Sequence, residues 1–549
     1  MTDIRRSEVP PVLATLADQL VAADPHTAHN LIAGFQGSAF DLAGTLKARA
    51  DHLLRVDVQG SLRCAAVLEL LANSSDDRRI AALAALVAAN AHSIGLGDYH
   101  TALSLYDHGV ALYQQLGLAI ESAQAQIGRI WTLACLGRHE EALAAGASSA
   151  AILRAHAQWK PLATLTMNLS AIHGRLGHDA ETLALLDSAL AICDDLGPDG
   201  DSLRPLVEQN RAIVLRNLGD FAQAESASQR AYDLLSSAGQ PVEAARALRN
   251  LAAIALLLGR YNEALRLLDR ARERFEHDGR AYDALVVAIE ISECLLRLRR
   301  FSDVLTTRDR VRERFTTQAQ GYELAQVCLQ AAAALAGLQR YAEALDELNT
   351  ARELFAAAGT TALVGACELE RATILIALGD RTNAYITAES SMVLFREHGL
   401  PLGETRAGIT AALAADDPEL ARALANEALA AANLLGVPEL AYQCRLLLGR
   451  IARAAGDQRA ARDQLDQAVE LIERLRGSLM VEFRPGYVED KQGAYDELIA
   501  LCLAAGDAAG ALAYAERAPF AGTGRSAGAT GAFAGSAPLR RRSRTGGRP

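Results

Sequence analysis

The sequence is poor in aromatic residues, which make up 5% of its 549 residues, and it contains only two tryptophans. Hydrophobic residues nevertheless account for half of the chain, because alanine is abundant. Strands are enriched in aromatic and β-branched residues, whereas alanine is the best helix former. The composition therefore favours an all-α fold of closely packed helices and argues against a sheet.

The chain also lacks a surplus of basic residues and any paired cysteines. Its 55 Lys and Arg stand against 66 Asp and Glu, a formal net charge of −11, whereas a general nucleic-acid surface needs concentrated Lys and Arg. The eight cysteines are scattered singly and form no CxxC pair, which gives no support to a zinc site or a redox motif. We expect them to be small apolar core residues, and we expect no nucleic-acid partner, metal or cofactor.

No segment reads as a signal peptide or a membrane span. The first twenty residues carry three acidic side chains and no clean apolar core, unlike a secretory signal. The most apolar run, Ile80 to Gly97, is interrupted by Asn90 and His92, which argues against a membrane span. We therefore expect a cytoplasmic protein.

Catalytic motifs are missing as well. His139-Glu140-Glu141 begins like a zincin helix, but Leu143 stands where the second His would be. The glycine-rich segment 522–528 has no preceding strand and no Gly-Lys-Ser/Thr ending. No Ser/His/Asp arrangement emerges either. We therefore expect no enzymatic activity.

What the chain does have is one repeated turn. In Leu258-Gly259-Arg260-Tyr261, a glycine able to adopt the left-handed conformation closes one helix before an aromatic residue begins the next. Equivalent turns are centred on residues 97, 137, 177, 219, 259, 299, 339, 379 and 456, mostly 40 residues apart. Arg299 and Gln339 replace the glycine at two of them, which costs up to about 1 kcal/mol each if the left-handed geometry is kept. Such a period predicts a solenoid.

Two columns of small residues accompany each turn and would allow neighbouring helices to approach closely. Seven residues before the turn position lie Ser170, Ala212, Ala252, Ser292, Ala332, Ala372 and Gly449. Five residues after it lie Ala102, Ala142, Ala224, Ala264, Ala344, Ala384, Ala461 and Ala511. This pattern resembles the tetratricopeptide repeat (TPR) in a long variant of about forty residues. The resemblance implies a right-handed superhelical solenoid of antiparallel helix pairs, for example helices at 241–258 and 261–277.

The register of the repeat predicts four parts of the chain. Residues 1–56 form an N-terminal helical cap, and residues 57–476 form the TPR solenoid. Residues 477–518 form a linker with a last helical pair. Residues 519–549 are rich in Gly, Ala, Ser, Thr and Pro, with six arginines and no acid, and we expect this basic tail to be disordered.

A second resemblance concerns the linker. The segments 472–479, 490–491, 494–499 and 511–518, which end in Glu516-Arg517-Ala518, resemble the part of CHAT-domain proteins that joins TPR arrays to a caspase-like cysteine peptidase. The peptidase module expected after Ala518 is missing, and the last cysteine is Cys502. The alternative to a scaffold is therefore a truncated CHAT-family protein that retains only its sensor half. A helical ligand-sensing domain of a signalling regulator is a further alternative.

Candidate partner-binding residues lie on the first helix of each pair. Nine residues before the turn position, three successive repeats place an asparagine: Asn168, Asn210 and Asn250. An amide can donate to and accept from a peptide backbone, and the resemblance to TPR proteins of the kinesin-light-chain type implies that use. Further candidates on the same helices are Trp131, Arg216, Arg246 and Arg249.

These residues predict capture of a partner peptide or protein segment in the concave groove, with the arginines pairing to an acidic ligand. The alternative is that the asparagines bond neighbouring helices and fix their packing.

Overall fold

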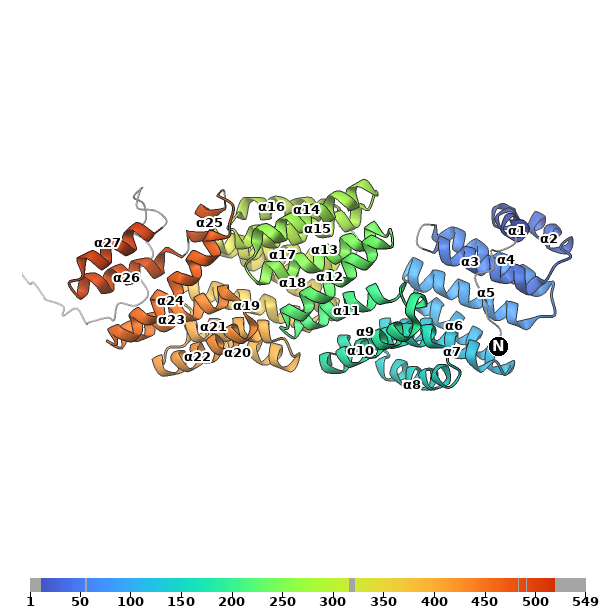
Figure 1. Ribbon diagram of the computed structural model, residues 1–549, viewed down its shortest axis with the longest axis horizontal. Coiled ribbons are helices and arrows are strands. Elements are labelled where there is room, and N and C mark those ends of the chain that lie inside the picture. The colour runs from blue at the N-terminus through green and yellow to red at the C-terminus, as the bar shows by residue number, and fades with distance from the viewer. Residues whose placement is uncertain are drawn as a thin grey trace, which may run out of the picture. The chain divides into compact units, whose positions relative to one another are not determined.

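The computed structural model describes residues 11–54, 57–176, 178–314, 321–481, 483–489 and 491–518. Within these ranges the regular elements are all helices, which succeed one another along the chain with short connections (Figure 1). The expected all-α solenoid of antiparallel helix pairs is therefore confirmed. Residues 1–444 and 445–549 form two compact units. The predicted disordered tail, residues 519–549, lies outside the described residues, and so do the glycine-rich segment 522–528 and Gly177.

The first unit begins with α1 (Pro11–Ala22), α2 (Pro25–Ala33) and α3 (Ala39–Leu53), which pack against α4 (Val58–Asn73). Asp24 caps α2, because its Oδ1 accepts from the backbone N–H groups of His26 and Thr27 at 3.0 and 3.1 Å. One apolar core continues from Leu20 in α1 to Ile80 in α5. These helices therefore share one apolar core with the start of the helical array.

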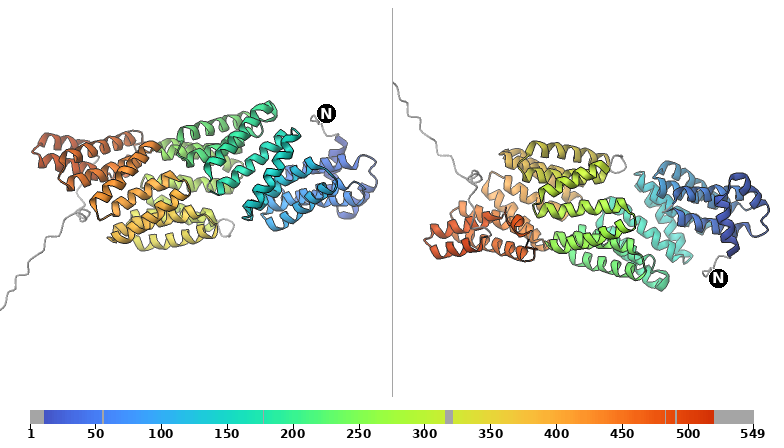
Figure 2. Two further views of the ribbon diagram at one scale, coloured as in Figure 1. Left: turned by 90° about the horizontal axis from the view of Figure 1, so that it is seen from below. Right: turned by 90° about the horizontal axis from the view of Figure 1, so that it is seen from above.

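The remaining helices alternate between two sets, which Figure 2 shows from two further sides. The first helices of the pairs, here called A helices, are α5 (Arg78–Asn90), α7 (Ala119–Cys135), α9 (Trp159–Arg175), α11 (Arg204–Asn217), α13 (Pro241–Leu257), α15 (Ala281–Arg297), α17 (Gly321–Gly337), α19 (Thr361–Leu378), α21 (Pro401–Ala414) and α23 (Pro438–Ala454). The second helices, called B helices, are α6 (Tyr99–Gln115), α8 (His139–Ala155), α10 (Asp179–Leu196), α12 (Phe221–Ser237), α14 (Tyr261–His277), α16 (Phe301–Arg314), α18 (Tyr341–Ala357), α20 (Arg381–Glu397), α22 (Pro418–Leu435) and α24 (Gln458–Gly477).

Five further elements complete the described chain. The π-helix η1 (Ala91–Leu96) extends α5, and the 3₁₀ turn η2 (Gly197–Asp199) follows α10. The second unit contains α25 (Arg484–Val488), α26 (Gln492–Ala504) and α27 (Ala508–Arg517), and α24 packs against α26. The helices expected at 241–258 and 261–277 correspond to α13 and α14 within one residue.

The predicted A-to-B turns are confirmed by their backbone angles. Gly219, Gly259 and Gly379 have φ values of 83°, 75° and 87°, in the left-handed region. Arg299 and Gln339 keep this geometry without being glycine, with φ values of 60° and 61°. The residues of both small columns are buried wherever their helices pair; Ala252, Ala264 and Ala344, for example, are at most 1% exposed. A larger side chain at these positions would push neighbouring helices apart.

A second series of left-handed residues closes the B helices and was not predicted. It runs through Gly117, Ala157, Gly197, Gly239, Gly279, Gly359 and Gly399, again mostly 40 residues apart. Ala157 is its one non-glycine member in the described chain, with φ 54°. Most described repeats therefore contain two left-handed turns, one after each helix, whereas the C-cap of α21, Ala415, has φ −62°.

By length and composition, the stretch Arg78–Leu96 could cross a membrane, with a mean hydropathy of 1.4. Half of its most apolar window is buried inside the array. Ile80, Ala82 and Val87 are at most 1% exposed because they pack against neighbouring helices. The apolar run therefore has a structural explanation as a core helix.

Candidate partner-binding surface

One face of the A helices is only half-buried and carries polar side chains. On α13 this face consists of Val242, Arg246, Arg249, Asn250, Ala253, Leu256 and Leu257, which are spaced three or four residues apart and so lie on one side of the helix. The residues between them, such as Ala247 and Ile254, are buried against neighbouring helices. We call the equivalent face of each A helix the inner stripe.

Inner stripes of non-adjacent helices lie close enough for charged groups on one helix to shift the pKa of groups on another. Burial lowers the pKa of Arg216 on α11, while Glu290 on α15 and Tyr322 on α17 act in the opposite direction. Burial also acts to lower the pKa of Arg297 on α15, but the charges of Glu293 and Glu370 help to raise it above the ordinary value. Because α11, α15, α17 and α19 are separated by B helices in sequence, their stripes must face a common space.

The turn after α11 also lies next to residues near the end of the first unit. The side chain of Leu435, at the end of α22, lies against Gly219, where a Cβ would come within 2.2 Å of its Cδ2 atom. Pro401, which begins α21, is the next neighbour of the same position. Burial raises the pKa of Tyr261 on α14, and the charge of Glu439 on α23 adds to the effect. Residues about 200 positions apart are thus brought together within the first unit.

Most charges on the inner stripes are neutralised inside the protein. Arg249 donates to Glu290 through Nε at 2.9 Å and through a terminal nitrogen at 2.6 Å, which is a bidentate pair between α13 and α15. Arg246 donates to Glu243 at 3.0 Å and to Asp283 at 3.4 Å. These two predicted binding arginines therefore also tie neighbouring A helices together.

Two arginines differ, because nothing pairs with them. Within the part of the chain that the structure describes, Arg216 and Arg406 make no side-chain hydrogen bond and no ion pair. The like charge of Arg297, followed by burial, lowers the pKa of Arg406 to about 10, while Glu370 opposes the change. Both arginines therefore present guanidinium groups that are not paired with a described carboxylate, although Glu290 acts on the pKa of Arg216 and Glu370 on that of Arg406.

The three asparagines of the predicted column have different surroundings. Asn168 on α9 donates from Nδ2 to the backbone oxygen of Ile127 on α7 at 3.1 Å. Gln330, at the same repeat position on α17, makes the equivalent bond to Ile289 on α15 at 3.2 Å. The amides of Asn210 and Asn250 bond to no other described residue, although both side chains are half-buried. One asparagine therefore supports packing, and two keep their hydrogen-bonding capacity.

The sequence analysis missed several apolar groups on this face. Tyr282 on α15 and Tyr322 on α17 are 48% and 40% exposed and occupy the same repeat position, 40 residues apart. Ile213 on α11 is 38% exposed and occupies the position that Trp131 has on α7, where the indole is half-buried. Counting backward from each turn would have found these columns, just as it found the asparagines.

The described residues contain no evident centre for bond-making chemistry. No group of three His, Cys, Asp or Glu side chains in the described ranges could hold a metal ion. Seven of the eight cysteines are buried, and burial raises the pKa of the Cys294 and Cys367 thiols to about 12. These thiols are protonated at neutral pH and do not resemble an activated nucleophile.

The fold and this polar inner face are those of a helical-repeat protein. The family model of the tetratricopeptide repeat matches residues 201–277, the part that includes α11, α12, α13 and α14. The TPR prediction is thereby confirmed. No curated protein matches the chain. The resemblance to the CHAT linker stays an interpretation of the sequence.

Several solved structures share the helical-repeat fold at low identity. The apo form of the quorum sensor NprR from B. thuringiensis is 12% identical, with a TM-score of 0.43 over 62% of this chain and 97% of that one. A Rap protein complexed with competence and sporulation factor is 11% identical, with a TM-score of 0.49 over 65% and 100%. The APC/C hetero-tetramer Cut9-Hcn1 is 15% identical, with a TM-score of 0.39 over 87% and 96%. With TM-scores below 0.5, these likenesses assign no partner to this chain.

Proposed function

We propose that this chain is a non-catalytic interaction scaffold that captures an extended segment of a protein partner along the inner stripes of α11, α13, α15 and α17. The observation that carries the proposal is the pair of unbonded, half-buried amides of Asn210 and Asn250. Neither amide is among the buried unsatisfied groups of the described residues, so both reach solvent and are open to a ligand. A peptide backbone offers the donor and acceptor that such an amide lacks.

Neighbouring side chains favour the same ligand. Tyr282 and Tyr322 are large, partly exposed rings that could hold apolar side chains of a partner, and tyrosines are common anchors at interfaces. Arg216 and Arg406 add guanidinium groups that form no ion pair with a described residue. Complementary charge speeds association and selects partners, so we propose that the captured segment is acidic.

The roles of the other candidate residues follow from their bonds. Arg246 and Arg249 hold α13 against α15 through Asp283 and Glu290, so we propose that they position the stripe. Asn168 has the packing role that its bond to Ile127 indicates. Trp131 lies on α7, two repeats before Asn210, so a captured peptide would contact it only if the peptide is long enough to reach α7.

A displayed library of random peptides tests the proposal. We expect selection against the full chain to return acidic segments. The Asn210→Ala, Asn250→Ala double variant should weaken them about tenfold, the effect of losing roughly two neutral hydrogen bonds. Asn433→Ala on the B helix α22, where the side chain is exposed, is the matched control and should bind normally.

Circular dichroism separates the two roles of the asparagines. The double variant should keep the helicity of the native chain. Lost helicity would assign Asn210 and Asn250 to packing, and selected peptides that ignore the double substitution would refute capture along these stripes.

A further inference from the structure

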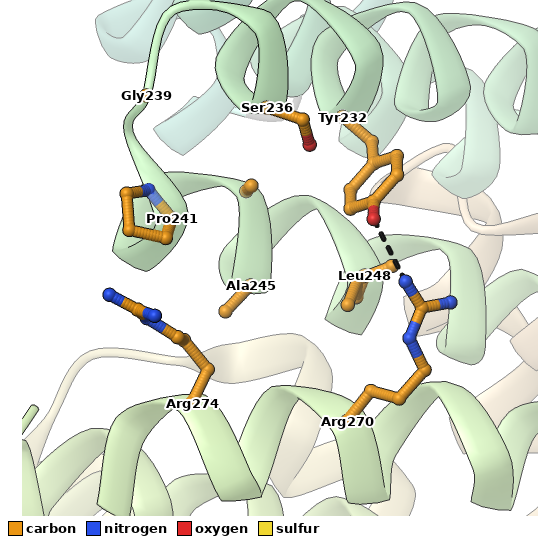
Figure 3. Close-up of a pocket in the computed structure, with 9 residues that line it drawn as sticks. Tyr232, Ser236, Gly239, Pro241, Ala245, Leu248, Arg270 and Arg274 are labelled. Carbon is orange, nitrogen blue, oxygen red and sulfur yellow. Dashed lines mark hydrogen bonds between the residues drawn. The ribbon is translucent and has the colours of Figure 1, made fainter. Parts of the chain in front are cut away.

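A separate pocket lies on another side of the same repeat, between the B helices α12 and α14 and the first half of α13 (Figure 3). Its volume is about 450 Å³, within the range of small-molecule sites. The lining residues that matter most are Tyr232, Ser236, Ala245, Leu248, Arg270 and Arg274.

This pocket does not belong to the inner stripe. Pro241, Ala244, Ala245 and Leu248 line it and are spaced three or four residues apart, so they share one face of α13. At 3.6 residues per turn, this face points roughly opposite to the one that carries Asn250. A ligand here would therefore occupy a different surface from a peptide on the inner stripe.

The polar lining is cationic and rich in hydroxyl groups. Arg270 donates to the hydroxyl of Tyr232 at 2.8 Å, and its guanidinium carbon lies 5.7 Å from the centre of that ring. Figure 3 shows Arg270 and Arg274 extending from α14 toward opposite ends of the pocket, Arg270 toward Tyr232 and Arg274 toward Pro241, with Tyr232 and Ser236 on α12 across the pocket. Each end of the pocket thus has one arginine, and the residues that line the pocket include no acidic residue.

Both guanidiniums retain unused donors. Within the described residues no carboxylate pairs with Arg270. Arg274 donates to Asp278 through Nε at 2.8 Å, and its two terminal nitrogens pair with no other described residue. Guanidiniums bind carboxylate and phosphate groups through paired N–H donors. Ala245 and Leu248 form an apolar floor of the pocket, which suits the apolar part of a ligand.

We propose that this pocket binds a small organic anion, a carboxylate or phosphate group carried on an apolar body. The anionic group would lie beside Arg270, where the hydroxyl of Tyr232 can donate to it, and Arg274 would lie at the other end of the pocket. The apolar body would rest on Ala245 and Leu248. This site is independent of the proposed peptide capture.

Fluorine NMR with two aryl probes tests the site on the full chain. We expect 4-fluorophenyl phosphate, 4-fluorophenylacetate or both to bind saturably, and inorganic phosphate alone to bind more weakly. Arg270→Gln should weaken binding about tenfold or more, the effect of losing a charged hydrogen bond. Arg266→Gln removes the same charge from an exposed position of α14 outside the pocket and should leave affinity unchanged.

The two probes also distinguish the anion. Binding of the phosphate alone would assign a phosphate ligand, and binding of the acetate alone a carboxylate. Ala245→Met, which places a larger side chain on the floor, should block either probe without loss of helicity. Absence of binding by both probes, equal binding by Arg270→Gln, or inorganic phosphate binding as tightly as the aryl phosphate would overturn the proposal.

Discussion

Replacing Gln339 by glycine should stabilise the turn between α17 and α18. Gln339 has φ 61°, in the left-handed region that costs an L-residue roughly 1–2 kcal/mol. Its side chain is exposed and bonds to no other described residue, so removing it sacrifices no contact. Glycine relieves the strain but adds about 0.4–1 kcal/mol of entropy to the unfolded chain. The expected net gain is about 0.5–1 kcal/mol.

Two other turns make the estimate sharper. Ala157 has φ 54° and an exposed side chain, so Ala157→Gly should give a similar gain. Arg299 has φ 60°, but its guanidinium carbon lies 4.9 Å from the ring centre of Phe301. That contact contributes about 0.5–1 kcal/mol, so Arg299→Gly should leave stability nearly unchanged.

Native-state hydrogen exchange is the suitable assay, because repeat arrays open locally and need not unfold as one unit. Gln339→Gly should slow exchange in α17 and α18, and Ala157→Gly should do so in α8 and α9. Gly379→Ala is the control, since φ is 87° and no atom lies within 4 Å of its Cβ position. It should destabilise α19 and α20 by about 1 kcal/mol. Faster exchange in Gln339→Gly, or no change in Gly379→Ala, would refute the strain argument.

Two further predictions test packing in the first unit. Gly219→Ala should destabilise α11 more than Gly379→Ala destabilises α19, because the added Cβ at position 219 would come within 2.2 Å of Leu435. Adding Leu435→Ala should recover the difference in hydrogen exchange, and equal effects of the two glycine substitutions would contradict the contact. Burial raises the pKa of Cys294 to about 12, so its thiolate is scarce below that pH and present only above it. Iodoacetamide at pH 8 should leave this thiol unmodified by mass spectrometry until urea is added, and rapid labelling of the native chain would show that it is accessible.

The repeating parts of the fold were predictable because they depend on local chemistry. The glycine, aromatic and alanine around Gly259 mark a helix end and a helix start within a few residues, so α13 and α14 were placed almost correctly. The B-to-A turns at Gly239 and Gly279 follow the same period. They were missed because the residues that follow them vary: the fifth residue after the turn is Ala244 after Gly239 but Ser122 after Gly117 and Glu404 after Gly399.

Differences among equivalent positions were not predictable, because they depend on distant neighbours. Asn168 and Asn250 are the same residue at the same repeat position, yet only Asn168 bonds to a carbonyl oxygen of the preceding A helix. Arg249 bonds to Glu290, which lies forty-one residues further along the chain, whereas Arg216 bonds to no other described residue. The repeat pattern predicts which side chains occupy equivalent positions. Whether one of them forms a hydrogen bond depends on the residues of neighbouring helices next to it.

The site of a photoreactive crosslink tests the central claim most directly. A selected acidic peptide that carries a benzophenone should label residues of α11, α13, α15 or α17 that belong to the inner stripes, with Tyr282 and Tyr322 among the nearest groups. Labelling confined to the B helices α12, α14 and α16 would contradict capture on the inner face.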